Sequence, residues 1–577
     1  MPGNYPTGHT RVRRATADHI NFFSTYIDTR SVHIAHPLLI PSKAGIHQQR
    51  RCMMSVTCSK KSAFMAAGLA LSLAFASTAS SQQSQNKDER PLPSVAESTT
   101  IFRQLEPELQ RFVDRQPRLP GQEKHVFVRI TPDLSTGIVW IDLDSGYTPK
   151  GQTEFSEEFG DKLGEVEAEL YEYLSGTVGF KYVIARIGGK TINEIFPPER
   201  LLKRKDQRST RAASGPLPGL VLINPGHGKY FHHGENVWKY ERPTPYAGTT
   251  NVYEDDVTPQ YASTLDTYLT SRSYMYATDV RHTRDILMPF IEPESNLPWK
   301  DLAARYYIKS LLPNEGPKIW NLYPNGKPGN ESLREYDEDV MARAKYANHI
   351  NAETFISLHT NAAGPTARGA LVMTQLDDPS SVQLSNNILC YMKEQINALE
   401  NYSDFVIRPA LVNGSNKAEV RDPEMPTALI EVAFHSNTED AAALQDSAFR
   451  SAAMKGVEKG YRTFKKGETD CRPLTITNVP AVTGPPRRDI PYTVQFVGSP
   501  TYPLYLRSKV VTCPPNYLCS QNSTQYVSPG SAPGTLNAVA RCTTAYPVSG
   551  SVIVLDRYLE DSDGVKSPMV RTSITCV

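Results

Sequence analysis

LVLINPGHG, residues 220–228, begins with four consecutive apolar residues and breaks at Pro225 and Gly226 before it reaches His227. A continuous apolar run of this kind is typical of a strand that is buried on both faces of a parallel sheet. In open α/β sheets, ligand-binding and catalytic side chains collect just beyond the carboxyl ends of the strands. His227 is therefore either an ordinary turn residue or a side chain that this strand holds at a functional edge.

Apolar strand patterns and amphipathic helix patterns alternate around this stretch, from residue 219 to about residue 466. Strands are expected at 219–224, 275–284, 353–361 and 426–437, and helices at 256–272, 339–350, 380–399 and 438–464. This alternation predicts an α/β domain with an open, mostly parallel sheet and helices on both faces. A segment at about 287–334, rich in Pro, Trp and Tyr, interrupts the pattern and is interpreted as an insertion. It either lines a sugar groove or packs structurally.

A chain of 577 residues is too long for one hydrophobic core, so further domains are expected on both sides. Residues 104–200 combine alternating strand patterns with a helical pattern at 156–174, which predicts a small α+β domain. Residues 490–577 contain short alternating strands separated by Gly, Pro and Ser, which is typical of a β-sandwich-like domain. Polar or Pro-rich linkers are expected at 80–103, 201–218 and 467–489.

A short apolar run near the amino terminus, AFMAAGLALSLAFA, follows two lysines and precedes small residues. It is shorter than the roughly 20 residues needed to cross a bilayer, so it predicts a secretory signal peptide at 53–79. Because Met53 and Met54 precede the run, translation is expected to start there, and residues 1–52 are interpreted as an over-long gene model. The mature chain is then expected to be periplasmic or extracellular, without a transmembrane span.

The cysteines agree with export, because four of the eight cluster near the carboxyl terminus. They are Cys513, Cys519, Cys542 and Cys576. In an exported domain such a group predicts two disulfides, for which three pairings are possible. A zinc ion held by four thiolates is the alternative, but the paired C-x-x-C spacing of such sites is missing.

Charge and repetition exclude other classes of protein. The formal net charge is +1 and the sequence pI is about 7.6, so no basic field points to a nucleic-acid partner. No period of 20–50 residues recurs, which argues against solenoids and propellers.

Four ionisable residues lie where chemistry is expected in such a sheet. His227 and His359 come at the ends of two strands, Glu431 lies inside a third, and Glu254 comes at the start of a helix. Two histidines and a carboxylate from separate elements form a common ligand set for catalytic zinc, with one position left for water. A second carboxylate would serve as general base, since zinc lowers the pKa of water but does not take up its proton. The alternative is that the histidines are ordinary turn or core residues.

The order of short motifs in this domain resembles that of the zinc-dependent N-acetylmuramoyl-L-alanine amidases, the bacterial cell-wall hydrolases. The motifs are LVLINPGHG, VYEDDV, VRHTRD, ARAKYANHINAETFISLHTNAA, RGALVM and TALIEVAFHSNTEDA. The resemblance implies that His227, Glu254 and His359 bind Zn²⁺ and that Glu431 is the catalytic glutamate. It also implies hydrolysis of the amide between N-acetylmuramic acid and L-alanine in peptidoglycan, with a metal-bound water as nucleophile.

The sequence departs from the family pattern at several positions. Asn224 stands where the family has aspartate, and Ala433 and His435 replace a glycine and an apolar residue after the catalytic glutamate. The loop after the first motif and the insertion at 287–334 are longer than usual. None of these departures removes an implied ligand, so they bear on substrate range and gating.

Other residues near the motifs have two possible roles each. His232 could approach the ion, but a loop histidine in this position more often contacts substrate or water. Arg343 and Asn361 are candidate substrate contacts, or they stabilise a helix face and a turn. Glu235 and Glu241 are expected to be solvated loop charges.

Two other functions are compatible with the sequence. One is a zinc carboxypeptidase of related α/β build that acts on peptidoglycan stem peptides. The other is a catalytically idle cell-wall-binding module that keeps the fold. The flanking domains are candidates for binding a regulatory protein or a wall polysaccharide.

Overall fold

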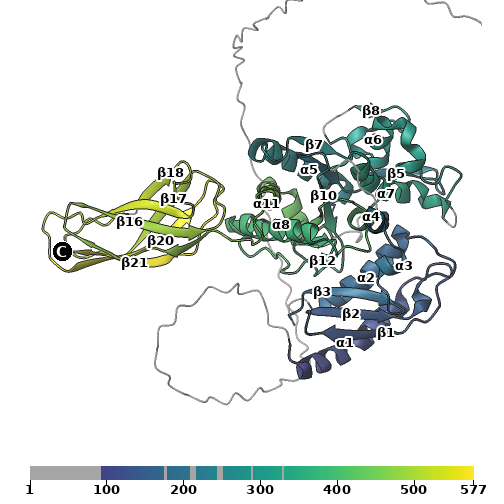
Figure 1. The fold of residues 1–577 in the computed structure, drawn as a ribbon, viewed down its shortest axis with the longest axis horizontal. Helices are drawn as coiled ribbons and strands as arrows, with labels where there is room; N and C mark the ends of the chain where they lie inside the picture. Colours follow the sequence, from purple (N-terminus) through teal and green to yellow (C-terminus); the bar gives the residue numbers. More distant parts are fainter. Residues whose placement is uncertain are drawn as a thin grey trace, which may run out of the picture. The chain divides into compact units, whose positions relative to one another are not determined.

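The computed structural model describes residues 93–577, apart from 175–178, 208–215, 243–250, 287–289, 328–329 and 521. The signal peptide and the start site predicted from residues 1–79 therefore lie outside the described residues. Within the described part of the chain, separate hydrophobic cores form in an amino-terminal unit, a central unit and a carboxyl-terminal unit (Figure 1). No helix in that part is long and apolar enough to cross a membrane.

The amino-terminal unit is a three-stranded sheet with two helices on one face. Its elements are α1 (Val95–Arg115), β1 (Val128–Asp133), β2 (Ile138–Leu143), α2 (Glu157–Leu174), β3 (Tyr182–Ile187), α3 (Ile192–Ile195) and α4 (Glu199–Gln207). β2 pairs with β1 antiparallel and with β3 parallel. Every second strand residue is buried and packs with the apolar faces of α1 and α2. α1 begins inside the stretch 80–103 that the composition suggested as a linker.

The central unit contains a six-stranded sheet in the order β12-β11-β13-β10-β4-β7. Its strands are β4 (Leu220–Pro225), β7 (Asp279–His282), β10 (Thr354–Asn361), β11 (Leu371–Thr374), β12 (Val412–Asn413) and β13 (Thr427–Phe434). β7, β4, β10 and β13 are mutually parallel, as predicted, but β11 pairs with β13 antiparallel. The sheet is therefore mixed. β11 follows β10 through a loop without a crossover helix, and a parallel return would need such a crossover.

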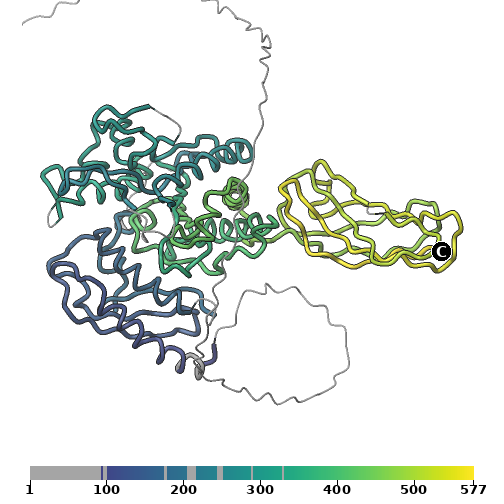
Figure 2. Tube along the Cα trace, turned by 180° about the vertical axis from the view of Figure 1, so that it is seen from behind, coloured from purple at the N-terminus to yellow at the C-terminus, as the bar shows by residue number. Residues whose placement is uncertain are grey.

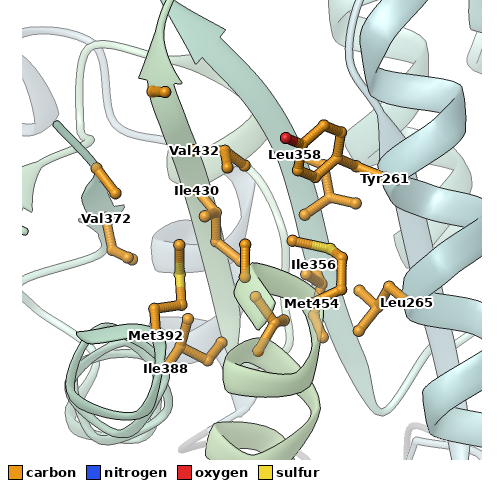
Figure 3. Close-up of a cluster of buried hydrophobic side chains, with 14 of the residues drawn as sticks. Tyr261, Leu265, Ile356, Leu358, Val372, Ile388, Met392, Ile430, Val432 and Met454 are labelled. Atoms are coloured by element: carbon orange, nitrogen blue, oxygen red, sulfur yellow. The ribbon is translucent and has the colours of Figure 1, made fainter. Parts of the chain in front are cut away.

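Helices cover both faces of this sheet, because alternate strand residues face opposite sides. Val221 and Ile223 of β4 pack with α5 (Glu254–Arg272), α8 (Pro379–Asn397) and α11 (Ser447–Lys465). Figure 3 shows this side, where β10 and β13 direct apolar side chains toward the helices. On the other face, Leu220 and Leu222 pack with α6 (Ala304–Leu311) and α7 (Arg334–His349).

Two glycines let α11 approach α8 closely. A Cβ atom on Gly456 would lie 2.5 Å from Met392 Cα, and one on Gly460 would lie 2.5 Å from Ile388 Cα. Any larger residue at either position would force the two helices apart.

Several local features of the central unit differ from expectation. The predicted helix 438–464 is two helices, α10 (Thr438–Gln445) and α11, because Asp446 leaves the helical conformation and caps the second helix. The insertion contributes α6 to the sheet cover, and its Trp320 packs against that core, which favours the structural interpretation. Short elements complete the unit: β5 (Lys229–His232), β6 (Val237–Tyr240), β8 (Ile291–Glu292), β9 (Leu297–Pro298) and α9 (Ala418–Arg421).

The carboxyl-terminal unit consists of two sheets that share one core. The first contains β14 (Thr475–Asn478), β16 (Asp489–Val497) and β19 (Thr535–Arg541). The second contains β15 (Val482–Gly484), β17 (Leu504–Thr512), β18 (Ser523–Tyr526), β20 (Ser551–Glu560) and β21 (Val570–Cys576). Figure 2 traces the path of the chain through this unit in yellow.

Disulfides tie this unit together as the cysteine spacing predicted. The structure pairs Cys513 with Cys519 and Cys542 with Cys576. A third disulfide, Cys390–Cys471, links α8 to the segment before β14 and was not predicted, because its partners lie 81 residues apart.

Candidate metal centre

The turn after β4 places His227 at the carboxyl edge of the sheet. Gly226 must be glycine, because a Cβ atom there would lie 2.3 Å from the His359 ring. His227 itself has a φ of 61°, a left-handed conformation that costs a non-glycine residue on the order of 1 kcal/mol and is found at functional sites. The Pro-Gly-His sequence thus brings two imidazole rings together.

Three other elements supply the remaining side chains. Glu254 is the first residue of α5, where the helix dipole stabilises a carboxylate. His359 lies on β10 and is in register with Glu431 on β13. Because these two strands are parallel neighbours, paired residues direct their side chains to the same face.

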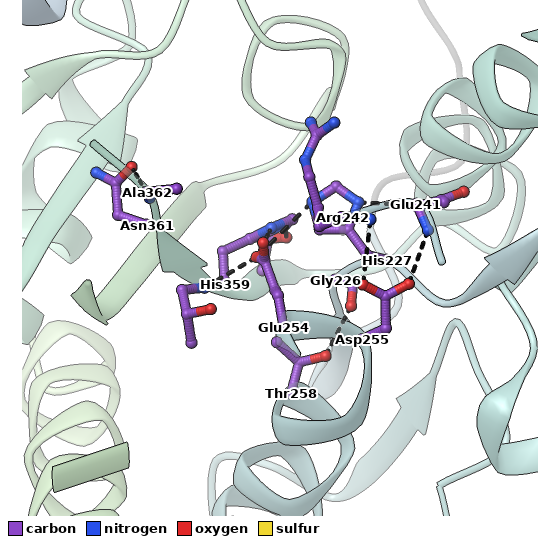
Figure 4. Close-up of polar contacts among 12 residues, drawn as sticks. Gly226, His227, Glu241, Arg242, Glu254, Asp255, Thr258, His359, Asn361 and Ala362 are labelled. Atoms are coloured by element: carbon purple, nitrogen blue, oxygen red, sulfur yellow. Dashed lines mark hydrogen bonds and ion pairs between the residues drawn. The ribbon is translucent and has the colours of Figure 1, made fainter. Parts of the chain in front are cut away.

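The two histidines and Glu254 are close enough to share a metal ion (Figure 4). Glu254 Oε1 lies 3.0 Å from His359 Nδ1 and 3.7 Å from His227 Nε2. One candidate ligand atom from each residue lies within 4.8 Å of the others. Tetrahedral ligands at zinc bond lengths stand about 3.3 Å apart, so the donor set and its spacing fit such an ion.

A second carboxylate holds each histidine from the opposite side of its ring. Glu241 Oε2 lies 2.9 Å from His227 Nδ1, and Glu419 Oε2 lies 3.0 Å from His359 Nε2. Such contacts fix the tautomer and the orientation of a metal-binding histidine. Arg343 joins the two carboxylates, at 2.8 Å from Glu241 and 2.9 Å from Glu419.

These contacts bear on two expectations from the sequence. Arg343 is fully buried, pairs also with Asp339 and is not among the cavity-lining residues, which agrees with the ion-pair alternative for this residue. Glu241 is 5% exposed and is not a solvated loop charge, whereas Glu235 is exposed as expected. Glu241 directly follows β6 and contacts His227, which accounts for its burial.

Asn224 takes part in the same network. Its amide donates to Glu419 and, at 2.8 Å, to Ser357 Oγ, while its oxygen accepts from Thr283. An aspartate at this position would have no N–H to donate and would repel Glu419. The amide at position 224 is therefore compatible with the carboxylate at position 419.

Burial and neighbouring charges shift the titration of these groups. Burial holds the pKa of His227 well below its usual value, so the ring is neutral and able to bind a metal. Burial alone would lower the pKa of His359, but Glu419 and Glu254 outweigh it and raise the pKa to about 10. A metal ion would displace that proton, because metal-binding imidazole must be neutral.

Glu241, Glu254 and Glu419 each pair with a histidine, whereas Glu431 forms no ion pair among the described residues. Burial raises the pKa of Glu431 to about 7, and nearby His359 only partly offsets this. Its Oε2 has no hydrogen-bond partner among the described residues. The side chain is thus free to exchange a proton with a bound substrate or water.

The site opens into a cavity of about 360 Å³. Asn361 lines this cavity and accepts a hydrogen bond from the Ala362 amide. His435 also lines it and lies 2.8 Å from Thr360 Oγ1. His232 lies on the β5–β6 hairpin, accepts a bond from the Glu235 amide and is not among the cavity-lining residues.

Glu241 and Glu419 are the members of the site that sequence reasoning missed. Glu241 directly follows strand β6, so an inspection of strand ends could have found it. Glu419 lies in the one-turn helix α9, where no periodic pattern separates a buried carboxylate from an exposed one.

Two histidines and two carboxylates around a cavity at the carboxyl edge of a sheet form an arrangement that could hold a metal ion, as in metal-dependent hydrolases. Residues 221–462 match the family described as N-acetylmuramoyl-L-alanine amidase. The central domain thus matches this family, as its motifs indicated. No curated protein sequence matches the chain.

Solved amidase structures also resemble part of the chain. They include the N-acetylmuramoyl-L-alanine amidase of Clostridium difficile 630, with 17% identity and a TM-score of 0.29 over 44% of this chain and 98% of that one. The catalytic domain of CwlV from Bacillus (Paenibacillus) polymyxa var. colistinus has 17% identity and a TM-score of 0.26, over 44% and 99% of the two chains. Ami1 of Mycobacterium smegmatis has 17% identity and a TM-score of 0.27, over 44% and 100%. The family assignment rests on the family match and not on these low scores.

Proposed function

We propose that the central domain is a zinc amidase that cleaves the bond between N-acetylmuramic acid and L-alanine in peptidoglycan. His227, Glu254 and His359 hold the ion, and Glu431 is the general base. The observation that carries this proposal is the His-Glu-His group, set beside an unpartnered glutamate on the adjacent strand within the family-matched segment.

The side chains of this site have different roles in the proposed reaction. When bound, zinc supplies a Lewis acid that polarises the scissile carbonyl and lowers the pKa of water. Glu241 and Glu419 keep the two histidines turned toward the ion. Glu431 removes a proton from the attacking water and later delivers it to the departing amine. Its pKa near 7 suits both steps, because the group must accept and return a proton near neutral pH.

Export is part of the same proposal. Peptidoglycan lies outside the cytoplasm, and the apolar run at 63–76 supplies the expected signal. The three disulfides support an oxidising compartment, because such bonds persist mainly in exported proteins.

The product of the reaction tests the function directly. The purified protein is incubated with peptidoglycan, with and without a chelator, and the soluble products are identified by mass spectrometry. We expect chelator-sensitive release of stem peptides that begin with free L-alanine. Release of a carboxyl-terminal amino acid with muramic acid still attached would instead identify a carboxypeptidase, and no release would identify an idle module.

A single variant tests the role of Glu431. Glu431→Gln keeps the shape of the side chain but cannot take up a proton, so we expect about a 100-fold or larger loss of turnover. Zinc content should stay unchanged, because Glu431 is not among the three candidate ligands. Retained turnover would refute the assigned role.

A further inference from the structure

The cavity beside the metal centre has two walls that are far apart in the sequence. One wall carries the metal-centre side chains His227, Glu254, His359 and Glu431. The other comes from the amino-terminal unit, chiefly from one face of α2. Gly164, Ala168 and Tyr171 belong to this face, because residues spaced by three and four positions lie on one side of a helix.

Close packing fixes α2 against the central unit. A Cβ atom on Gly160 would lie 2.1 Å from the carbonyl oxygen of Asn416, so the helix backbone directly contacts the segment before α9. Asp161 pairs with Lys417. Any side chain at position 160 would push the helix away from this segment.

Buried hydrogen bonds reinforce this contact. Glu167 accepts bonds from Asn413 at 3.3 Å and from Asn416 at 2.7 Å. Glu157 accepts a bond from the Ala418 amide at 3.1 Å. The next residue is Glu419, which holds His359, so α2 anchors the segment that positions a metal-binding histidine.

The middle of the α2 face is left open. Ala168 lines the cavity and is exposed, whereas Gly164 beside it packs against Asn416, whose Nδ2 would lie 3.0 Å from a Cβ atom at position 164. A cavity of about 360 Å³ falls within the range of small-molecule sites, which are roughly 300–1,000 Å³. The small side chain of Ala168 therefore leaves room next to the metal centre.

We propose that α2 is a substrate-binding wall of the active site and that Ala168 determines which substrates fit. Part of a muramyl peptide lies between α2 and the metal centre when its scissile amide reaches Glu431. This inference rests on the proposed amidase function and extends it, because it gives the amino-terminal unit a role in substrate recognition.

The test fills the space from the α2 side without touching the catalytic groups. Ala168→Trp is combined with Glu431→Gln, so that the zinc-loaded protein binds a soluble N-acetylmuramyl peptide without turnover, and binding is measured by calorimetry. We expect binding about tenfold or more weaker than in Glu431→Gln alone, because the indole occupies substrate space. Zinc affinity should not change. Lys162→Trp, on the same helix but not lining the cavity, is the matched control and should bind as the parent does.

A second variant tests whether α2 lines the substrate site or only covers it. Gly160→Leu wedges α2 away from Asn416, so we expect weaker peptide binding and no additional effect of Ala168→Trp. Three results would overturn the proposal: peptide binding by Ala168→Trp equal to the parent, no measurable binding in the parent, or tighter binding by Gly160→Leu. The last would show that α2 covers the site instead of lining it. Product analysis of the wild type tests the amidase function separately, so failure of the α2 wall can be distinguished from failure of the proposed function.

Discussion

Arg343 and Arg305 are two buried arginines of the central domain with different surroundings. Arg305 pairs with Glu335 at 3.1 Å and with Glu338 at 2.8 Å. Both of its partners belong to α7, and Arg305 does not line the described cavity. Arg343 instead pairs with Glu241 and Glu419, and each of those carboxylates contacts a histidine of the metal centre.

This difference shows which buried charges indicate a functional site. Buried ion pairs are expensive to desolvate, and many serve only to hold elements in place. Arg305 fits that description, because its network joins α6 to α7. The Arg343 network ends on histidine nitrogens, so its geometry affects whatever those rings bind.

Removal of each arginine tests the comparison with the largest expected effect. Arg343→Met and Arg305→Met each leave buried carboxylates uncompensated, so we expect each to lower the free energy of unfolding by about 3–5 kcal/mol. Only Arg343→Met should also weaken zinc binding, by about 10–100-fold, because Glu241 and Glu419, which orient the two histidines, lose the arginine that holds them in place. Denaturant unfolding and competition with a zinc chelator measure the two effects. Equal zinc affinity in both variants would contradict the distinction.

Glu167 is a buried carboxylate that has no arginine partner, so its pKa can be compared with that of Glu419. Glu167 accepts hydrogen bonds only from amides, and burial raises its pKa to about 7. Glu419 is also buried, but the charges of His359 and Arg343 outweigh burial and hold its pKa well below the usual range. Since the native state binds the Glu167 proton more tightly, stability falls as pH rises from about 4.5 to about 7. The difference between these values corresponds to about 3 kcal/mol.

Glu167→Gln should remove this part of the pH dependence. We expect the free energy of unfolding of the variant, relative to that of wild type, to be higher at pH 8 than at pH 4.5. The reason is that only the wild-type side chain must ionise in the interior as the pH rises. Unfolding midpoints measured across this pH range provide the test. Parallel pH profiles for the two proteins would show that Glu167 does not titrate as described.

The smallest expected effect comes from a carboxylate added beside Glu419 in the Arg343 network. Asn224→Asp places a second carboxylate against Glu419 and removes its amide donor, so we expect about 2 kcal/mol of destabilisation and weaker zinc binding. Glu419→Gln in the same chain removes the repulsion and should recover part of both losses. A double-mutant cycle measures this coupling. Additive effects would mean that the two positions are independent.

The sequence predicted the parallel part of the sheet, and the strand-end rule pointed to His227 and His359 as candidate site residues. Glu254 and Glu431 were instead chosen from the start of a helix and from inside an apolar strand. The run before His227 and the run that contains Glu431 are both long and apolar. The direction of β11 escaped prediction, since a four-residue strand carries little pattern. The place of α2 could not be foreseen either, because Glu167 and Asn416 are 249 positions apart and no local signal links them.

Metal content tests the central claim most directly. Zinc per chain is measured by mass spectrometry in purified wild type, in Glu431→Gln and in His359→Ala, with folding checked by circular dichroism. The geometry predicts one zinc per chain in the first two proteins and none in the third. A folded wild type without zinc, or a folded His359→Ala that keeps it, would contradict the shared site.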